Sequence, residues 1–257
     1  MKLTALRCSR RTAGLALVAL VAGCTTPTPI PTSTPPPIPV VAKDTKAIVA
    51  DPHNGTMPRH EKFNALAKAG GFDVLFVGDS ITHGWESGGK AVWAAKIAPF
   101  KAANFGIGGD RTEHVLWRFE HGNLEGALNP KVIIIMIGTN NTGHRKDKPE
   151  ETAAGIGAIC AKLHERFPHA QQLLLAIFPR SAKPTDEMRV INDNVNKIIA
   201  QYNGHWNIKF VDINAKLLEA DGTLSKEIMP DLLHPNAKGY AIWADAIVPE
   251  IQTALKK

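Results

Sequence analysis

Five short apolar segments alternate with helix-like segments along the chain, and this alternation most constrains the fold. The apolar segments contain few polar residues, as is usual for strands that are buried on both faces of a sheet. Such strands, when helices separate them, form a mainly parallel sheet with helices packed on both faces. The sequence therefore predicts an α/β fold with a five-stranded sheet. The predicted strands are residues 73–78, 101–106, 131–138, 171–178 and 208–213.

Helical periodicity fills the intervals between these strands and continues after the last one. The final segment places Tyr240, Trp243, Ile247 and Ile251 three or four residues apart, which is typical of one buried helix face. The predicted helices are residues 58–71, 91–98, 112–120, 150–167, 186–203 and 236–255.

Small or polar residues follow three of the predicted strands, where a buried strand would otherwise continue. The sequence GDS follows the first strand, GIGGDR the second and GTNN the third. Sites in parallel α/β sheets form at the carboxyl ends of the strands, where the loops gather. We therefore expect a functional site that includes Ser80, Gly109 and Asn140.

The residue types at these positions suit nucleophilic catalysis on an ester. A serine hydroxyl such as that of Ser80 needs a base within hydrogen-bonding reach. His234 lies three residues after Asp231 in a predicted loop, so one loop can supply both the base and the carboxylate that orients it. The amides of Ser80 and Gly109 and the side chain of Asn140 are candidate donors to the oxyanion. A solvated His234 without a catalytic role is the alternative.

The remaining histidines and two tryptophans are weaker candidates. His83 and His144 lie near the proposed site in the sequence, and Trp85 and Trp117 are either core residues or platforms for a sugar ring. We expect the following histidines at the surface: His53, His60, His164, His169 and His205.

No motif for a cofactor, a metal ion or a nucleic acid stands out. Gly106, Gly108 and Gly109 do not form G-x-G-x-x-G and no P-loop is present, so a nucleotide-binding Rossmann protein is a weak alternative. Of the net charge of +6, four positive charges come from the first eleven residues, and the other basic residues are scattered. We expect no cofactor, no metal ion and no nucleic-acid partner.

The N-terminal residues differ from the rest of the chain. Basic residues precede the apolar stretch 12–24, which is too short to span a bilayer and has the form of a signal peptide. It ends in LVAGC, which resembles the bacterial lipobox and implies that Cys24 is lipidated. The Pro/Thr-rich residues 25–40 favour an extended spacer. An ordinary cleaved signal with a chance cysteine is the alternative.

These features predict a lipoprotein signal peptide (1–23), a linker after the lipidated cysteine (24–42) and one globular domain (43–257). The protein is then exported to the bacterial cell envelope and anchored in a membrane through Cys24. We expect the outer membrane, with the domain facing the periplasm or the cell surface. The sequence leaves the oligomeric state open.

Four motifs together resemble those of the GDSL-type, or SGNH, hydrolases in order and spacing. They are GDS with Ser80, NFGIGGDR with Gly109, GTNN with Asn140, and DLLH with Asp231 and His234. The segments NFGIGGDRTEHVLWRFEHGNLEG and IGTNNTGH are particularly similar to the catalytic subunits of intracellular platelet-activating factor acetylhydrolase. The chain departs from the GDSL motif that gives the family its name, because Ile81 stands where that motif has leucine.

The resemblance implies a three-layer α/β/α sandwich with a flavodoxin-like sheet. It also implies that Ser80 is the nucleophile, His234 the general base and Asp231 its orienting partner. Gly109 and Asn140, with the Ser80 amide, would form the oxyanion hole, without a metal ion.

The resulting hypothesis is a serine esterase that removes short acyl groups, chiefly acetyl, from carbohydrate or cell-envelope substrates. Its rate is expected to rise with pH as His234 loses its proton. A hydrolase of lysophospholipid or platelet-activating-factor-like esters is the runner-up. A surface glycan-binding lipoprotein without turnover is the alternative from another class.

Overall fold

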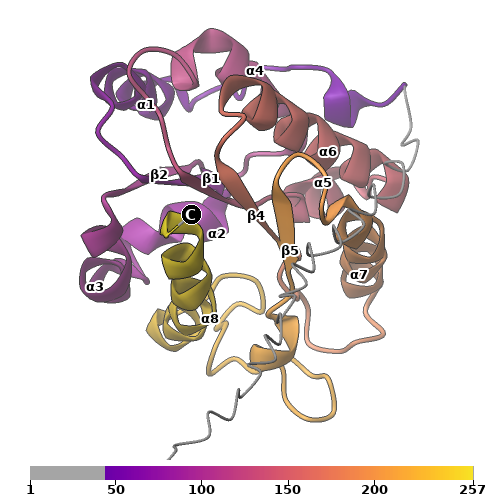
Figure 1. Ribbon diagram of the computed structural model, residues 1–257. Helices are drawn as coiled ribbons and strands as arrows, with labels where there is room; N and C mark the ends of the chain where they lie inside the picture. Colours follow the sequence, from indigo (N-terminus) through magenta and orange to yellow (C-terminus); the bar gives the residue numbers. More distant parts are fainter. Residues whose placement is uncertain (1–43, 257) are drawn as a thin grey trace, which may run out of the picture. The chain divides into compact units, whose positions relative to one another are not determined.

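A five-stranded sheet lies at the centre of the computed structural model, which describes residues 44–256 (Figure 1). All neighbouring strands are parallel, in the order β2-β1-β3-β4-β5. Each strand falls within a predicted segment, so the predicted α/β fold with a five-stranded parallel sheet is confirmed. The strands are β1 (Val74–Gly78), β2 (Ala102–Gly106), β3 (Val132–Met136), β4 (Gln171–Leu175) and β5 (Ile208–Val211).

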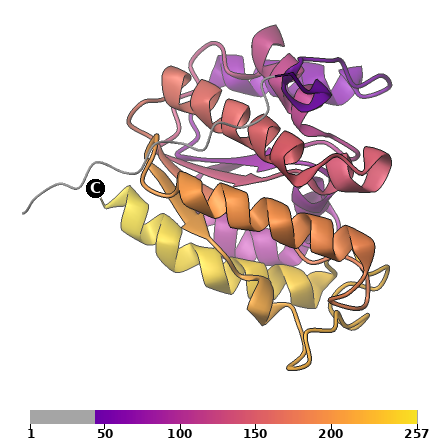
Figure 2. The ribbon, with the colours of Figure 1, turned by 90° about the vertical axis from the view of Figure 1, so that its right-hand side faces the viewer.

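Side chains alternate along the strands into two separate cores, one on each face of the sheet. Leu75 and Val77 join the core under α1, α4, α6 and α7, whereas Val74 and Phe76 join the core under α8. Figures 1 and 2 show α6 and α8 on opposite sides of the sheet. The helices are α1 (Met57–Ala69), α4 (Thr112–Arg118), α6 (Pro149–Arg166), α7 (Glu187–Ile199) and α8 (Ala237–Leu255).

Two short helices were not predicted, and one predicted helix is irregular. Helices α2 (Ser80–His83) and α5 (Thr139–Arg145) begin directly after β1 and β3. Their sequences are polar and lack an apolar periodicity, which is why the pattern did not indicate them. The predicted helix 91–98 is instead a single turn, α3 (Lys90–Val92), followed by a π-helical turn and a 3₁₀ turn that contains Pro99.

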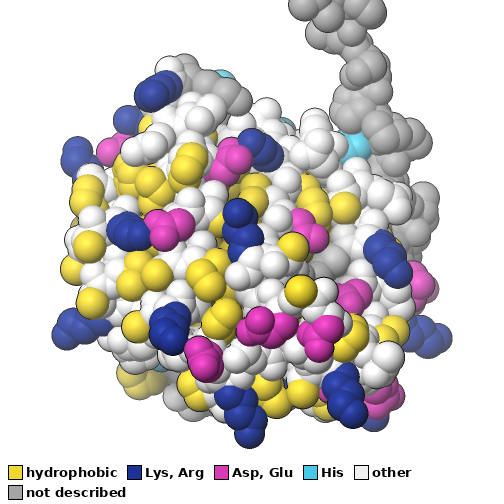
Figure 3. Space-filling model, turned by 90° about the horizontal axis from the view of Figure 1, so that it is seen from below, with side chains coloured by type: hydrophobic (Ala, Val, Ile, Leu, Met, Phe, Trp, Pro, Cys, Tyr) yellow, Lys and Arg dark blue, Asp and Glu magenta, His cyan; other side chains and the backbone are white. Residues whose placement is uncertain are grey.

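Within residues 44–256, no helix combines the length and the hydropathy needed to cross a bilayer. The predicted signal peptide (1–23) and the whole predicted linker (24–42), which includes Cys24, lie outside these residues. Figure 3 shows one face of the described part, on which acidic and basic side chains are interspersed among hydrophobic ones. Exposed ion pairs of the described residues include Lys96–Asp245 and Lys238–Glu227.

Candidate active site

The end of β1 is shaped so that Ser80 begins a helix rather than continuing the strand. A Cβ on Gly78 would lie 2.1 Å from the Oγ1 of Thr82 and 2.3 Å from the carbonyl oxygen of Met136, so only glycine fits there. Asp79 then caps α2, because its Oδ1 accepts the N–H of Ile81 at 3.0 Å. As the first residue of α2, Ser80 has no helical partner for its N–H, which stays available to a ligand.

Ser80, His234 and Asp231 form a continuous chain of hydrogen bonds. The Oγ of Ser80 lies 2.8 Å from Nε2 of His234, and Nδ1 of the same ring lies 2.6 Å from Oδ2 of Asp231. The side chains of His234 and Asp231 are 42% and 57% exposed, so this part of the hydrogen-bond chain is accessible to solvent. This arrangement can remove a proton from the Ser80 hydroxyl and hold the resulting imidazolium.

The backbone around Asp231 fixes the carboxylate against the ring. Its Oδ1 accepts the N–H groups of Leu233 and His234 at 3.0 and 2.7 Å. Burial raises the pKa of Asp231, but the hydrogen bonds from His234 and Leu233 outweigh this effect and lower the pKa below its ordinary value. Asp231 therefore stays ionised and favours the tautomer of His234 that presents a free Nε2 to Ser80.

The loop after β2 lies beside Ser80 and is tied to β1. The N–H of Ile107 donates to the carbonyl oxygen of Gly78 at 3.2 Å. A Cβ on Gly108 would lie 3.9 Å from the Cβ of Ser80, so Gly108 is within contact distance of the serine. Gly109 has a φ of +80°, a conformation that glycine adopts readily. Its N–H has no protein partner among the described residues.

Asn140 is joined to the same loop through the backbone of Asp110. The Nδ2 of Asn140 donates to the carbonyl oxygen of Asp110 at 2.9 Å, and the side chain is buried. An amide nitrogen carries two hydrogens, so one remains for another acceptor. Arg180 holds the start of α5, since it donates to the carbonyl oxygen of Thr139 at 2.7 Å. The structure thus joins Asn140, in α5, to the loop that carries Gly109 and that lies beside Ser80.

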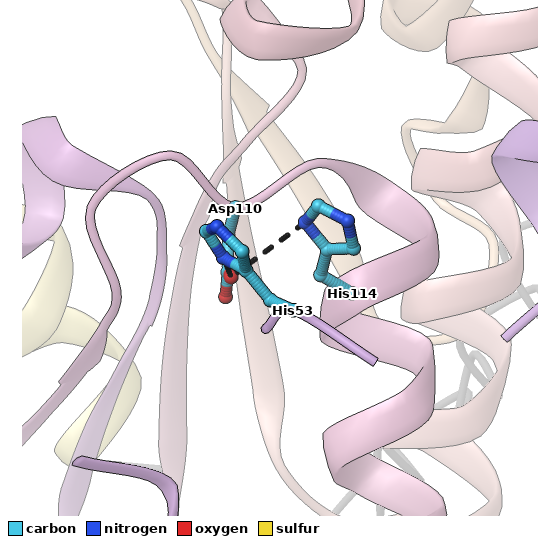
Figure 4. A group of neighbouring side chains, drawn as sticks. All are labelled: His53, Asp110 and His114. Atoms are coloured by element: carbon cyan, nitrogen blue, oxygen red, sulfur yellow. Dashed lines mark hydrogen bonds and ion pairs between the residues drawn. The ribbon is translucent and has the colours of Figure 1, made fainter. Parts of the chain in front are cut away.

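Three side chains beside this loop carry atoms that can bind metal ions, but their hydrogen bonds fit an ion-pair network better. The ligand atoms of His53, Asp110 and His114 lie within 4.8 Å of one another (Figure 4). Nδ1 of His53 lies 2.9 Å from Oδ1 of Asp110, and Nδ1 of His114 accepts the N–H of Arg111. The buried guanidinium of Arg118 donates to Oδ2 of Asp110 at 2.9 Å, and its charge opposes a cation.

The structure corrects the expected placement of His60 and His53 and decides between the two alternatives for Trp85. His60 is buried rather than at the surface, and His53 is half-buried because it packs against the loop of Gly109. Trp85 is fully buried against Tyr240 and Trp243, so it is a core residue and not a sugar platform. The partners of the His53 side chain, Asp110 and His114, lie more than fifty positions away in the sequence, and no local pattern could reveal them.

A buried carboxyl group next to the nucleophile was also missed. Asp79 is fully buried, and its Oδ2 has no hydrogen-bond partner among the described residues. Burial raises the pKa of Asp79 to about 7, despite the opposing hydrogen bond from Ile81. A charged residue within an apolar run was the available signal, but it served only to mark the end of the strand.

Comparison with known proteins agrees with the motifs. Residues 76–242 match the GDSL-like lipase/acylhydrolase family. Platelet-activating factor acetylhydrolase IB subunit alpha1 of Pongo abelii is 39% identical over 189 residues, covering 72% of this chain and 78% of the relative.

Two solved structures share the fold, each at 22% identity. A GDSL-like lipase from Bacteroides thetaiotaomicron superposes with a TM-score of 0.58, covering 78% of this chain and 98% of that one. An acetylxylan esterase from Geobacillus stearothermophilus superposes with a TM-score of 0.57, covering 72% and 96%. Together with the family match and the acetylhydrolase relatives, this means that the chain belongs to the GDSL-like lipase/acylhydrolase family and is a carboxylic ester hydrolase.

Proposed function

We propose that the protein is a serine esterase that removes short acyl groups, chiefly acetyl, through an acyl-enzyme on Ser80. The observation that carries this proposal is the hydrogen-bond chain from Ser80 through His234 to Asp231. The nearby Gly109 and Asn140 supply donors where the oxyanion would develop. A protein that only binds glycans has no need of this arrangement, and the family assignment speaks against that alternative.

In the first half of the reaction, the Oγ of Ser80 attacks the ester carbonyl carbon while Nε2 of His234 takes the hydroxyl proton. The negative charge moves to the carbonyl oxygen, which accepts hydrogen bonds from the N–H groups of Ser80 and Gly109 and from Nδ2 of Asn140. The bond between the carbonyl carbon and the alcohol oxygen then breaks. His234 returns the proton to the departing alkoxide oxygen, and the acyl group remains on Ser80.

In the second half, water replaces the alcohol. His234 takes a proton from the water as its oxygen attacks the acyl carbon, and the same donors hold the second oxyanion. The bond from the acyl carbon to Oγ breaks, His234 returns the proton to Ser80, and the carboxylic acid leaves. Asp231 stays ionised throughout and stabilises the imidazolium in both halves.

The proposed substrates are acetylated carbohydrates or other cell-envelope esters. Export through the predicted signal peptide would bring the domain to such polymers. Among the described residues, the large hydrophobic side chains that are exposed are Val49 and Val190. Two separated valines do not make a broad apolar surface of the kind that binds lipid chains. This favours short acyl groups on polar acceptors.

A lipid ester is the second candidate, because the relatives at 38–39% identity are named platelet-activating factor acetylhydrolases. The acyl group that such a name implies is also acetyl, so the two candidates differ in the alcohol that leaves. Acetate release from acetylated xylo-oligosaccharides and from an acetylated ether phospholipid, measured on one preparation, separates them.

The reaction itself is tested with p-nitrophenyl acetate and the full-length protein beside Ser80→Ala. We expect the substitution to abolish turnover while the folded state persists. Equal rates in the two proteins would overturn the proposal. Butyrate and octanoate esters of the same phenol then define the acyl length, and we expect the rate to fall with each extension.

We also propose that the protein is anchored through a lipid on Cys24. Incorporation of radiolabelled palmitate during bacterial expression, compared between the wild type and Cys24→Ala, tests this. Label in the wild type alone supports the anchor. Equal or absent labelling would favour an ordinary cleaved signal, and fractionation of the two membranes then locates the labelled protein.

A further inference from the structure

The side chain of His53 lies against the oxyanion loop but takes no part in the mechanism described above. Its Nδ1 lies 2.9 Å from Oδ1 of Asp110, and its ring stacks on His114 with centroids 4.4 Å apart. A Cβ built on Gly109 would lie 3.0 Å from Cε1 of His53, so the ring edge covers this glycine. Figure 4 shows the rings of His53 and His114 beside the carboxylate of Asp110.

Asp110 is held at four points, one of which is His53. Its N–H donates to Ile107, and its carbonyl oxygen accepts the Nδ2 of Asn140 at 2.9 Å. Its carboxylate accepts Nε of Arg118 at one oxygen and the imidazole of His53 at the other. Two hydrogen bonds, both to Asp110, therefore link His53 to the side chain of Asn140.

The backbone of His53 is also held by hydrogen bonds, which keep the ring against Asp110 and Gly109. Its carbonyl oxygen accepts both the N–H and the Oγ1–H of Thr56, at 3.2 and 2.7 Å. On the other side of the ring, burial lowers the pKa of His114 to about 4. A neutral His114 can accept the N–H of Arg111 and leaves Oδ1 of Asp110 to His53.

We propose that His53 is a positioning residue of the oxyanion hole, acting on Asn140 through Asp110 and on Gly109 by direct contact. Oxyanion donors contribute to the rate only when they already point to the position of the developing charge. Without the imidazole, Oδ1 of Asp110 loses its donor, and the Asp110 peptide that orients Asn140 is less constrained. Gly109 at the same time loses the side chain that covers it. This inference rests on the proposed function.

The experiment measures kcat and KM for p-nitrophenyl acetate in the wild type and in His53→Ala, with His169→Ala as an exposed-histidine control. We expect His53→Ala to lower kcat about tenfold with little change in KM, since the donors act in the transition state. The control should match the wild type. A rise in KM at constant kcat would mean that His53 contacts the substrate, and an unchanged kcat would mean a purely structural role; both overturn the proposal.

Two conservative variants separate the hydrogen bond to Asp110 from other effects of the ring. The amide nitrogen of His53→Asn can take the place of Nδ1, whereas that of His53→Gln lies nearer the place of Nε2. We expect the Asn variant to be the more active of the two. A Gln variant that equals or exceeds it overturns the proposal, and this comparison stands even if His53→Ala does not fold.

A double-mutant cycle with Asn140→Ala tests the route of the effect. If His53 acts through Asn140 and Gly109, its removal costs less in the Asn140→Ala protein than in the wild type. Full additivity would overturn the coupling. Loss of Ser80-dependent turnover already in the wild type is a different result, because it would contradict the proposed function before any His53 variant is compared.

Discussion

The hydroxyl group of Tyr240 donates to the carbonyl oxygen of Ile81 at 2.7 Å, across 159 positions of the sequence. This bond joins α8 to the short helix that begins with Ser80, and the loop of His234 immediately precedes α8. The same tyrosine fills the space over Gly84, where a Cβ would lie 2.1 Å from its hydroxyl oxygen. The contact therefore sets the position of the nucleophile relative to the base.

Removal of this hydroxyl group alone should weaken both folding and catalysis. We expect Tyr240→Phe to reduce the free energy of unfolding by about 1–2 kcal/mol, because a buried hydrogen bond is lost. The value of kcat should also fall, since α2 is no longer tied to α8. Urea denaturation and turnover of p-nitrophenyl acetate measure the two effects. Unchanged values of both would contradict the role given to the contact.

The carboxylate of Asp231 is expected to matter for the reaction rate and little for the stability of the fold. In Asp231→Asn, the ring of His234 loses the acceptor that fixes its tautomer, and we expect kcat to fall by at least about 10²-fold. Because the side chain is 57% exposed, the melting temperature should change little. Asp221→Asn, at another exposed aspartate, serves as the control and should retain full activity.

The buried pair of Arg118 and Asp110 should be costly to break. Arg118→Met keeps a long apolar side chain but leaves the Asp110 carboxylate buried, with His53 as its remaining side-chain hydrogen-bond partner. We expect a loss of about 3–5 kcal/mol in the free energy of unfolding, as for other buried pairs that lose one member. Arg166→Met, at an exposed arginine, should cost less than about 1 kcal/mol. Similar losses in the two variants would contradict this account.

Asp79 should make stability fall as the pH rises. Its pKa is raised by burial from 3.8 to about 7, so the folded state keeps a proton that the unfolded state has released. The stability contributed by this proton is complete at low pH and is lost as the pH rises through about 7. Asp79→Asn cannot titrate but keeps an acceptor for the N–H of Ile81.

Urea denaturation at pH 5 and pH 8 checks this prediction. We expect the stability of Asp79→Asn relative to the wild type to be greater at pH 8 than at pH 5. The opposite trend would show that the carboxyl group is ionised in the folded protein and has a partner there.

The sheet could be predicted because each strand carries its own signal. Residues Val132–Met136 are apolar without interruption, and such a short run is typical of a strand that is buried on both faces. Helix α5 could not be predicted in this way, since its residues Thr139–Arg145 are held by distant groups. Asn141, for example, accepts the N–H of Thr112, and Arg180 binds Thr139.

The residues of the site differ in the same way: some carry a local sequence signal, and others depend on distant contacts. Ser80, Asp231 and His234, which hydrogen bonds join in the structure, could be predicted from short motifs, because Ser80 follows a strand and the other two lie three residues apart in one loop. His53 was placed at the surface, because its segment HNGT has no periodicity and its partner is 57 positions away. Arg118 lies in a helical segment whose pattern gives no sign of burial, although its guanidinium is buried and donates to the carbonyl oxygen of Phe105.

The hydrogen bond between Ser80 and His234 spans 154 positions, nearly the whole of residues 76–242 that match the family. The nucleophile is synthesised early and its base late, so a nascent or truncated chain without the last loop and helix holds an inactive serine. Turnover can begin only when Ser80 and the loop of His234 have come together. The return of esterase activity therefore reports the final step of folding. After dilution from denaturant, recovery of activity should lag behind formation of the sheet.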